Sequence, residues 1–155
     1  MKKYIVPLII GGVILIVAGV LLVNGGKEVK IDIKEFANDI IENVDFEDEL
    51  NVIDEKTVTM MYDIDNALNE IVYMGSGATA EEFAIFEFED RQGSKEALEK
   101  AKVRIEDQKL SFKDYMPKEM KKLDNAILIN KGNYLIVCVT DDQEGAEKIL
   151  DKYIK

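Results

Sequence analysis

Residues 73–90 read YMGSGATAEEFAIFEFED, and the fold depends on what this stretch forms. Gly75, Gly77 and Ala80 have the G-x-G-x-x-A spacing that opens a dinucleotide-binding fold. In that fold a helix follows the glycines, because its N-terminal N–H groups bind the pyrophosphate. Here the following EEFAIFEF alternates small or aromatic residues with others at period two, which is typical of a strand. The stretch therefore predicts two paired strands joined by a glycine loop, and no nucleotide site.

The second strand of this hairpin begins a pattern that returns later in the chain. AIFEFEDRQGSKEALEKAKV from Ala84 aligns with LIVCVTDDQEGAEKILDKYI from Leu135 at a constant offset of 51 residues. Each copy predicts a ββα unit of strand, turn, strand and helix, although any two passages from strand to helix could look this similar. The predicted strands are 70–75, 81–89, 126–131 and 134–140. Lys131-Gly132-Asn133 has the composition of a tight turn between the last two.

Helix-capping residues and the periodicity of apolar residues predict the helices. Asp32 precedes IKEFANDIIENV, whose apolar residues fall on one helical face, and Asp32 with Glu35 resembles a capping box. Asp54 can cap a shorter helix, and residues 94–115 form an amphipathic helix that Pro117 ends. The predicted fold class is α+β: one domain with an antiparallel sheet of about four strands in two ββα units, with helices packed on one face.

An apolar segment precedes this domain. Residues 4–23, YIVPLIIGGVILIVAGVLLV, carry no charge and are long enough to span about 30 Å of hydrocarbon as a helix. A cleaved signal has a shorter apolar region and a small-residue cleavage site, so we expect an uncleaved signal-anchor. Lysines flank both ends, and the orientation rests on the layout of a short basic tail before a long acidic domain. The expected organisation is a cytoplasmic tail at 1–3, a transmembrane helix at 4–23, a linker at 24–30 and an extracytoplasmic domain at 31–155.

The composition excludes several classes of function. The chain has 31 acidic and 20 basic residues, a net charge of −11, and is repelled by nucleic-acid phosphates and anionic lipids. It has no histidine, which excludes imidazole zinc sites and histidine-based catalytic triads. Its one cysteine, Cys138, lies in the apolar run YLIVCVTD and is predicted to be a buried core residue. We therefore expect no cofactor, no nucleotide and no nucleic acid as a partner.

Two longer stretches carry a family resemblance. YMGSGATAEEFAIFEF and IEDQKLSFKDYMPKEMKKLDNAILINKGNYLIV together resemble a family of small Gram-positive bacterial domains of unknown function, held at the membrane by a lipoprotein signal or a single anchor. The resemblance covers about Val29 to Ile154, and the GATAEE loop, the Q-x3-F-x2-Y-x-P segment and the KGNY turn are its most specific parts. This chain has no lipidation cysteine, so a helix would replace the lipid anchor. The resemblance implies an extracytoplasmic location and supplies no catalytic residues.

The first functional hypothesis is a non-enzymatic binding or accessory module at the cell envelope, with the membrane and an envelope protein or peptide as partners. Its candidate binding loop contains Gly75, Ser76, Gly77 and Thr79, because glycine loops with hydroxyl groups present hydrogen-bond donors to peptides or sugars. The alternative for this loop is a plain hairpin turn.

Two further hypotheses depend on the acidic residues. A carboxylate-dependent cell-wall hydrolase needs a pair of carboxyl groups in which an apolar setting raises one pKa, and the sequence nominates no such pair. A divalent cation could bind Asp63, Asp65 and Glu70, but YDIDNALNE lacks the turn glycine of a calcium loop. An acidic turn at the end of a helix is therefore the favoured interpretation of these three residues, and no metal ligand is predicted.

Overall fold

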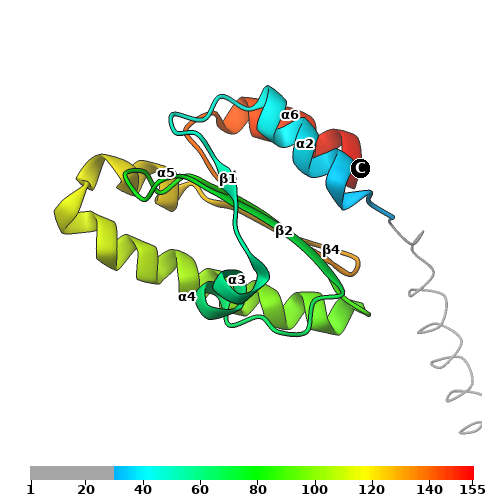
Figure 1. The fold of residues 1–155 in the computed structure, drawn as a ribbon. Coiled ribbons are helices and arrows are strands. Elements are labelled where there is room, and N and C mark those ends of the chain that lie inside the picture. Colours follow the sequence, from blue (N-terminus) through cyan, green and yellow to red (C-terminus); the bar gives the residue numbers. More distant parts are fainter. Residues whose placement is uncertain (1–29) are drawn as a thin grey trace, which may run out of the picture.

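The computed structural model describes residues 30–155. The predicted tail, transmembrane helix and linker, up to residue 29, lie outside the described residues. Among the described helices, none is long and apolar enough to cross a membrane. The described part forms an α+β domain built around one antiparallel sheet (Figure 1).

The sheet has five strands in the order β1-β2-β3-β5-β4. Their bounds are Asn51–Val52 for β1, Asn69–Met74 for β2, Glu82–Glu87 for β3, Ile127–Lys131 for β4 and Tyr134–Val139 for β5. β2 to β5 are the four predicted strands, with ends that differ by at most two residues. The expectation of about four strands missed β1, because a strand of two residues shows no periodicity.

The hairpin expected from residues 73–90 is confirmed. β2 and β3 pair along their whole length, with Asn69 opposite Glu87 and Met74 opposite Glu82. A strand, and not a helix, follows the glycine loop, so the geometry of a dinucleotide-binding turn is absent at this loop. β4 and β5 form the second predicted hairpin around a two-residue turn in which Gly132 has a φ of +58°.

The described residues form five α-helices and one short 3₁₀ helix. Their bounds are Ile33–Asn43 for α2, Glu55–Tyr62 for α3, Arg91–Tyr115 for α4, Met120–Asp124 for α5, Gln143–Ile154 for α6 and Pro117–Glu119 for η1. Aspartates cap four of them: the carboxylates of Asp32, Asp54, Asp90 and Asp142 accept N–H groups from the first turns of α2, α3, α4 and α6. The two caps predicted at Asp32 and Asp54 are confirmed.

Helices cover both faces of the sheet, which corrects the expectation that they pack on one face. α3, α4 and α5 lie on one side, and α2 and α6 lie side by side on the other (Figure 1). Alternate residues of the central strands enter the two cores, so that Phe86 and Val137 meet the first group of helices while Phe83 and Ile136 meet the second. A strand that is apolar at every position, as β5 is, must be buried on both faces.

The two predicted ββα units are present, but they diverge at their helices. β2, β3 and α4 form the first unit, and β4, β5 and α6 form the second. Strand residues at the offset of 51, such as Phe86 and Val137, face the same side of the sheet. α4 and α6 nevertheless pack on opposite faces. The repetition therefore extends through the strands and ends before the helices.

Cys138 lies in β5 and is completely buried. Burial raises the pKa of its thiol to about 12, so the thiol stays protonated at neutral pH. The prediction of a core cysteine is confirmed.

Candidate functional site

The predicted binding loop lies between β2 and β3, where Asp48 fixes it from the preceding segment. The N–H and the hydroxyl group of Ser76 both donate to Oδ2 of Asp48 at 2.8 Å, and the Thr79 hydroxyl lies 3.5 Å from the same oxygen. The bonds from Ser76 hold the pKa of Asp48 below its usual range. A Cβ added to Gly75 would lie 2.6 Å from that carboxylate, so a larger residue there would displace the Asp48 side chain. The hydroxyl groups expected to meet a ligand are thus bonded within the domain.

A buried lysine stands behind this loop. Nζ of Lys122 lies 2.7 Å from a carboxylate oxygen of Glu47 and 3.2 Å from oxygens of Glu81 and Glu119. We call these four residues the lysine cluster. Burial opposes the charge of Lys122, but the hydrogen bonds to its three carboxylates outweigh burial and raise its pKa. Hydrogen bonds from Lys122 and then Lys118 lower the pKa of Glu47 to about 2.

The lysine cluster joins three parts of the chain. Glu81, directly before β3, accepts the N–H groups of Glu47 and Asp48 at 3.0 and 2.8 Å. Glu119 of η1 accepts the N–H of Ala80 at 2.9 Å. The bond to Ala80 holds the end of the loop of residues 75–80, and the bonds to Glu47 and Asp48 hold the segment that carries Asp48, so the cluster fixes the loop from behind.

A second buried ion pair connects β3 to α4. Glu82 accepts hydrogen bonds from the hydroxyl of Tyr62, from Arg104 and from Gln108, and the Arg104 guanidinium lies 4.7 Å from the centre of the Tyr62 ring. We call these four residues the arginine cluster. Burial and the charge of Glu82 raise the pKa of Tyr62. The carboxylate is fully buried, so this cluster belongs to the core.

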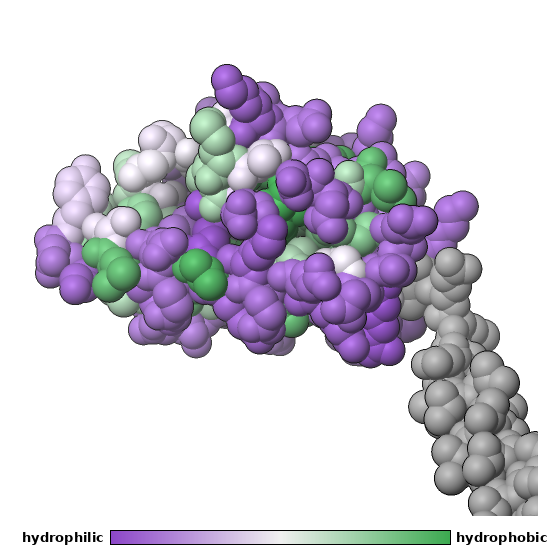
Figure 2. All heavy atoms as spheres, turned by 90° about the horizontal axis from the view of Figure 1, so that it is seen from below, coloured by the Kyte–Doolittle hydropathy of each residue, from purple (hydrophilic) through white to green (hydrophobic). Residues whose placement is uncertain are grey.

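The surface over α4 carries hydrophobic side chains in small separate areas among hydrophilic ones (Figure 2). A more enclosed feature lies beside β2, where a groove of about 440 Å³ opens between this strand, α3 and the segment that connects them. Its lining residues are Val52, Ile53, Glu55, Val58, Thr59, Ile64, Asp65, Ala67, Leu68, Asn69, Glu70, Ile71 and Val72. Two exposed apolar side chains, Val52 at 63% and Leu68 at 61%, stand at this groove.

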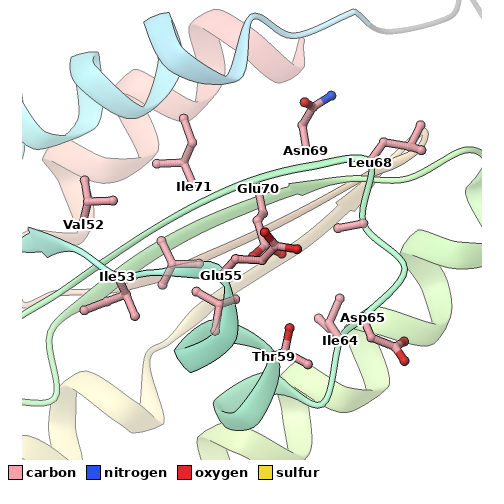
Figure 3. Close-up of a pocket in the computed structure, with 13 residues that line it drawn as sticks. Val52, Ile53, Glu55, Thr59, Ile64, Asp65, Leu68, Asn69, Glu70 and Ile71 are labelled. Atoms are coloured by element: carbon pink, nitrogen blue, oxygen red, sulfur yellow. The ribbon is translucent and has the colours of Figure 1, made fainter.

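Two carboxylates converge in the groove. Figure 3 shows the side chains of Glu55 and Glu70 pointing toward one another, whereas Asp65 points away. Burial, and then the negative charge of Glu55, raise the pKa of Glu70 above its usual value. Oε1 of Glu70 is buried and finds no hydrogen-bond partner among residues 30–155. The groove thus holds a half-buried carboxylate, one oxygen of which has no partner among the described residues.

The backbone N–H and C=O of Glu70 lie at the edge of β2 that borders the groove. β1 pairs with only Tyr73 and Met74 of β2, and the last bond toward this edge runs from the N–H of Ile53 to the carbonyl of Val72 at 2.9 Å. Alternate residues of a strand direct their N–H and C=O groups to the same neighbour. The N–H and C=O of Glu70 therefore point out from the same edge of β2, beyond the end of β1. No described strand pairs with Glu70 at this edge.

The three acidic residues considered for a divalent cation are not assembled into one site. Asp63 ends α3 with a φ of 56° and forms an ion pair with Lys100 at 3.3 Å. Glu70 lies in the groove, and Asp65 points away from it (Figure 3). Within residues 30–155, no group of three or more His, Cys, Asp or Glu side chains is placed to hold a metal ion.

Sequence reasoning missed the pair formed by Glu55 and Glu70. The two residues belong to α3 and β2, and nothing in their separate contexts predicts that the helix packs under the strand edge. One signal was available: the alternation in EIVYM places Glu70 on the same face as Val72 and Met74, which enter or touch the core. A glutamate on the core face of a strand marks a position to examine.

No curated protein and no solved structure matches the chain. Residues 42–140 match the family described as a domain of unknown function, DUF4358. The matched range contains all five strands, the loop, the groove and both buried clusters. Because it covers more than half of the chain, the protein belongs to the DUF4358 family.

Proposed function

We propose that the protein is a non-enzymatic binding or accessory module at the cell envelope, and that it captures an extended polypeptide segment at the groove beside β2. The open edge of β2 above this groove is the observation that carries the proposal. Extended segments bind such edges by adding a strand, with backbone hydrogen bonds supplying affinity and side-chain pockets supplying specificity.

The shape of the groove supports this kind of ligand. Proteins usually protect an open strand edge, because unpaired N–H and C=O groups invite another chain. Here β1 protects only the end of β2 that leads into the loop, and leaves the edge open at Glu70. The groove volume lies within the range of about 300–1,000 Å³ that is common for ligand sites. A bound segment would cover Leu68, a large apolar side chain of the groove lining that is now exposed.

The proposed location rests on the sequence. The uncharged run at residues 4–23 supports a single-pass membrane anchor, and the resemblance to lipoprotein and membrane-anchored domains of Gram-positive bacteria supports an extracytoplasmic domain. The acidic domain is repelled by anionic lipid, so retention at the membrane would depend on the anchor.

The loop of Gly75, Ser76, Gly77 and Thr79 is proposed as a second contact with the same partner. It directly follows β2, and residues 76–78 are exposed. Since Asp48 engages both hydroxyl groups, contact would involve the backbone of the loop more than its side chains. Replacing Ser76 and Thr79 by Ala should then reduce partner capture only slightly.

Site-specific photocrosslinking in cells tests the proposal. A photoreactive residue replaces Leu68 at the groove in the full chain, and a matched variant carries it at Leu110 of α4, which is exposed to a similar extent, 63% against 61%. We expect a discrete adduct with one envelope polypeptide at position 68 and none at position 110. Equal labelling at both positions, or no adduct at position 68, would overturn the assignment of the groove.

One observation favours a second candidate, a carboxylate-dependent cell-wall hydrolase. Burial and Glu55 raise the pKa of Glu70, as happens to the general acid of a carboxylate pair. If the protein is such an enzyme, the purified chain releases soluble fragments from cell walls and Glu70→Gln abolishes the release. A binding module releases none with either chain.

A further inference from the structure

The carboxylate of Glu70 needs a partner that the domain does not supply. Oε1 of Glu70 is buried without a hydrogen bond among the described residues, although buried polar atoms are nearly always paired in native proteins. None of the residues that line the groove is a lysine or an arginine. The neighbouring acid is Glu55, whose charge repels that of Glu70. A hydrogen-bond donor with a positive charge would relieve both the missing bond and the repulsion.

The open edge of β2 determines how a segment that carries such a donor would bind. A segment that continues the ladder beyond β1 would bond to the N–H and C=O of Glu70. The side chain directly opposite Glu70 would lie on the same face of the sheet, at the short distance of a cross-strand pair. That side chain would therefore point into the groove, toward the carboxylates of Glu70 and Glu55 (Figure 3).

We propose that the groove selects an extended segment of another polypeptide that carries a lysine or arginine opposite Glu70. This inference rests on the proposed function, because it specifies the ligand of the same groove. The ammonium or guanidinium group pairs with Glu70 and Glu55, and a neighbouring residue of the segment contacts Leu68. The net charge of −11 attracts basic segments to the domain before they bind.

A peptide segment fits the groove better than a metal ion or a small amine. The two convergent carboxylates are too few for a calcium site, which takes six to eight oxygen ligands. A small amine would leave the N–H and C=O of Glu70 unpaired and the Leu68 side chain exposed. Of these ligands, an extended chain alone uses the strand edge, Leu68 and the two carboxylates together.

The test uses the full chain in detergent micelles and a mixed library of capped hexapeptides. Peptides retained by the wild type, by Glu70→Gln and by Glu147→Gln are sequenced by mass spectrometry. Glu147 is an exposed residue of α6, on the other side of the sheet, so its substitution makes the same change in charge away from the groove. A fourth chain, Glu55→Gln, tests the second carboxylate. Melting temperatures show that each variant folds; Glu70→Gln removes an unfavourably buried charge and should melt no lower than the wild type.

We expect the wild type and Glu147→Gln to enrich lysine and arginine over glutamine at one peptide position by about tenfold, the size of one charge-assisted hydrogen bond. Glu70→Gln should lose this preference, and Glu55→Gln should weaken it. Retained peptides without a basic preference, or a preference that survives Glu70→Gln, would overturn the inference and leave the proposed function standing. Retention of no peptide by any of the four chains would overturn both.

Discussion

At the scale of single residues, the arginine cluster explains how α4 is held on the sheet. The side chains of Arg104 and Glu82 are 9% and 0% exposed, so both charges have left water almost completely. Burial opposes the charge of Arg104, but the hydrogen bonds and the charge of Glu82 outweigh it and raise the pKa of the guanidinium. A buried ion pair adds little net stability, but each partner becomes costly when the other is removed.

Replacing Arg104 by Ala should therefore be strongly destabilising. Glu82 would remain in the core as an unpaired charge, and we expect the free energy of unfolding to fall by about 3–5 kcal/mol. Thermal or urea unfolding measures the change. Lys102→Ala is the matched control on the same helix, because Lys102 forms only an exposed ion pair with Glu99, and it should cost less than about 1 kcal/mol. Equal losses in the two variants would contradict the role of the arginine cluster.

The lysine cluster predicts how the stability of the fold changes at acidic pH. The pKa of Glu47 is about 2 in the folded protein and 4.5 for an ordinary glutamate. Its contribution to stability is fully present above pH 4.5 and is lost as the pH falls toward 2. We expect Glu47→Gln to melt below the wild type at pH 6, and the difference to vanish by about pH 2 as the wild type loses the same contribution.

Melting curves at several pH values check this sign, and Glu49→Gln is the control. Glu49 is an exposed residue of the same segment and forms no ion pair in the described part of the chain. The difference in melting temperature between Glu49→Gln and the wild type should stay nearly constant at all pH values tested. A gap between wild type and Glu47→Gln that widens on acidification would contradict the assignment.

At the scale of elements, the loop between β2 and β3 depends on its backbone. Gly77 has a φ of +90°, which residues with a Cβ rarely adopt. Gly77→Val should lower the free energy of unfolding by at least about 1–2 kcal/mol, because a β-branched residue is strained there. Ala78→Val, at the next exposed position, should change it by less than about 0.5 kcal/mol. Equal effects in a denaturation series would mean that the loop rearranges freely.

The elements show what local sequence can and cannot predict. Asp32 and Asp54 were recognisable as caps, and the period-two aromatics of β3 identified a strand, because these signals depend on adjacent residues. The position of α2 and α6 on the second face was not predictable in this way. It follows from contacts between distant segments, such as the ring contact of Phe36 with Tyr153 at 4.6 Å.

The same limit applies to the candidate site. A glycine loop visible in the sequence identifies Ser76 and Thr79, but their partner Asp48 lies 28 and 31 residues upstream of them. From the sequence, Glu70 is a candidate cation ligand or part of an acidic turn, and nothing there predicts a pair with Glu55. Its unpaired oxygen and its raised pKa arise from packing against α3, which brings Glu55 to the same groove. Tertiary packing, and not a local motif, makes this residue unusual.

At the scale of the whole molecule, the family match and the fold divide the domain in the same way. Residues 42–140 contain the sheet, α3, α4 and α5, whereas nearly all of α2 and all of α6 lie outside the match. These two helices pack together on the face opposite α4, and the described chain begins beside the C-terminal end of α6 (Figure 1). The described chain therefore begins on the face of the sheet that α2 and α6 cover. The groove lies at the β2 edge, on the side of the sheet that α3 covers.

The last prediction concerns the membrane anchor that we propose for residues 4–23. The uncharged run at residues 4–23 should keep the full chain in the membrane fraction after a carbonate wash, because an acidic domain alone has no attraction to anionic lipid. A fragment that begins at Lys27 is the control and should stay in the supernatant. Protease added to intact cells should remove the domain, since we propose that it lies outside. Digestion only after lysis would reverse the orientation, and release of the full chain by the wash would remove the anchor from the proposal.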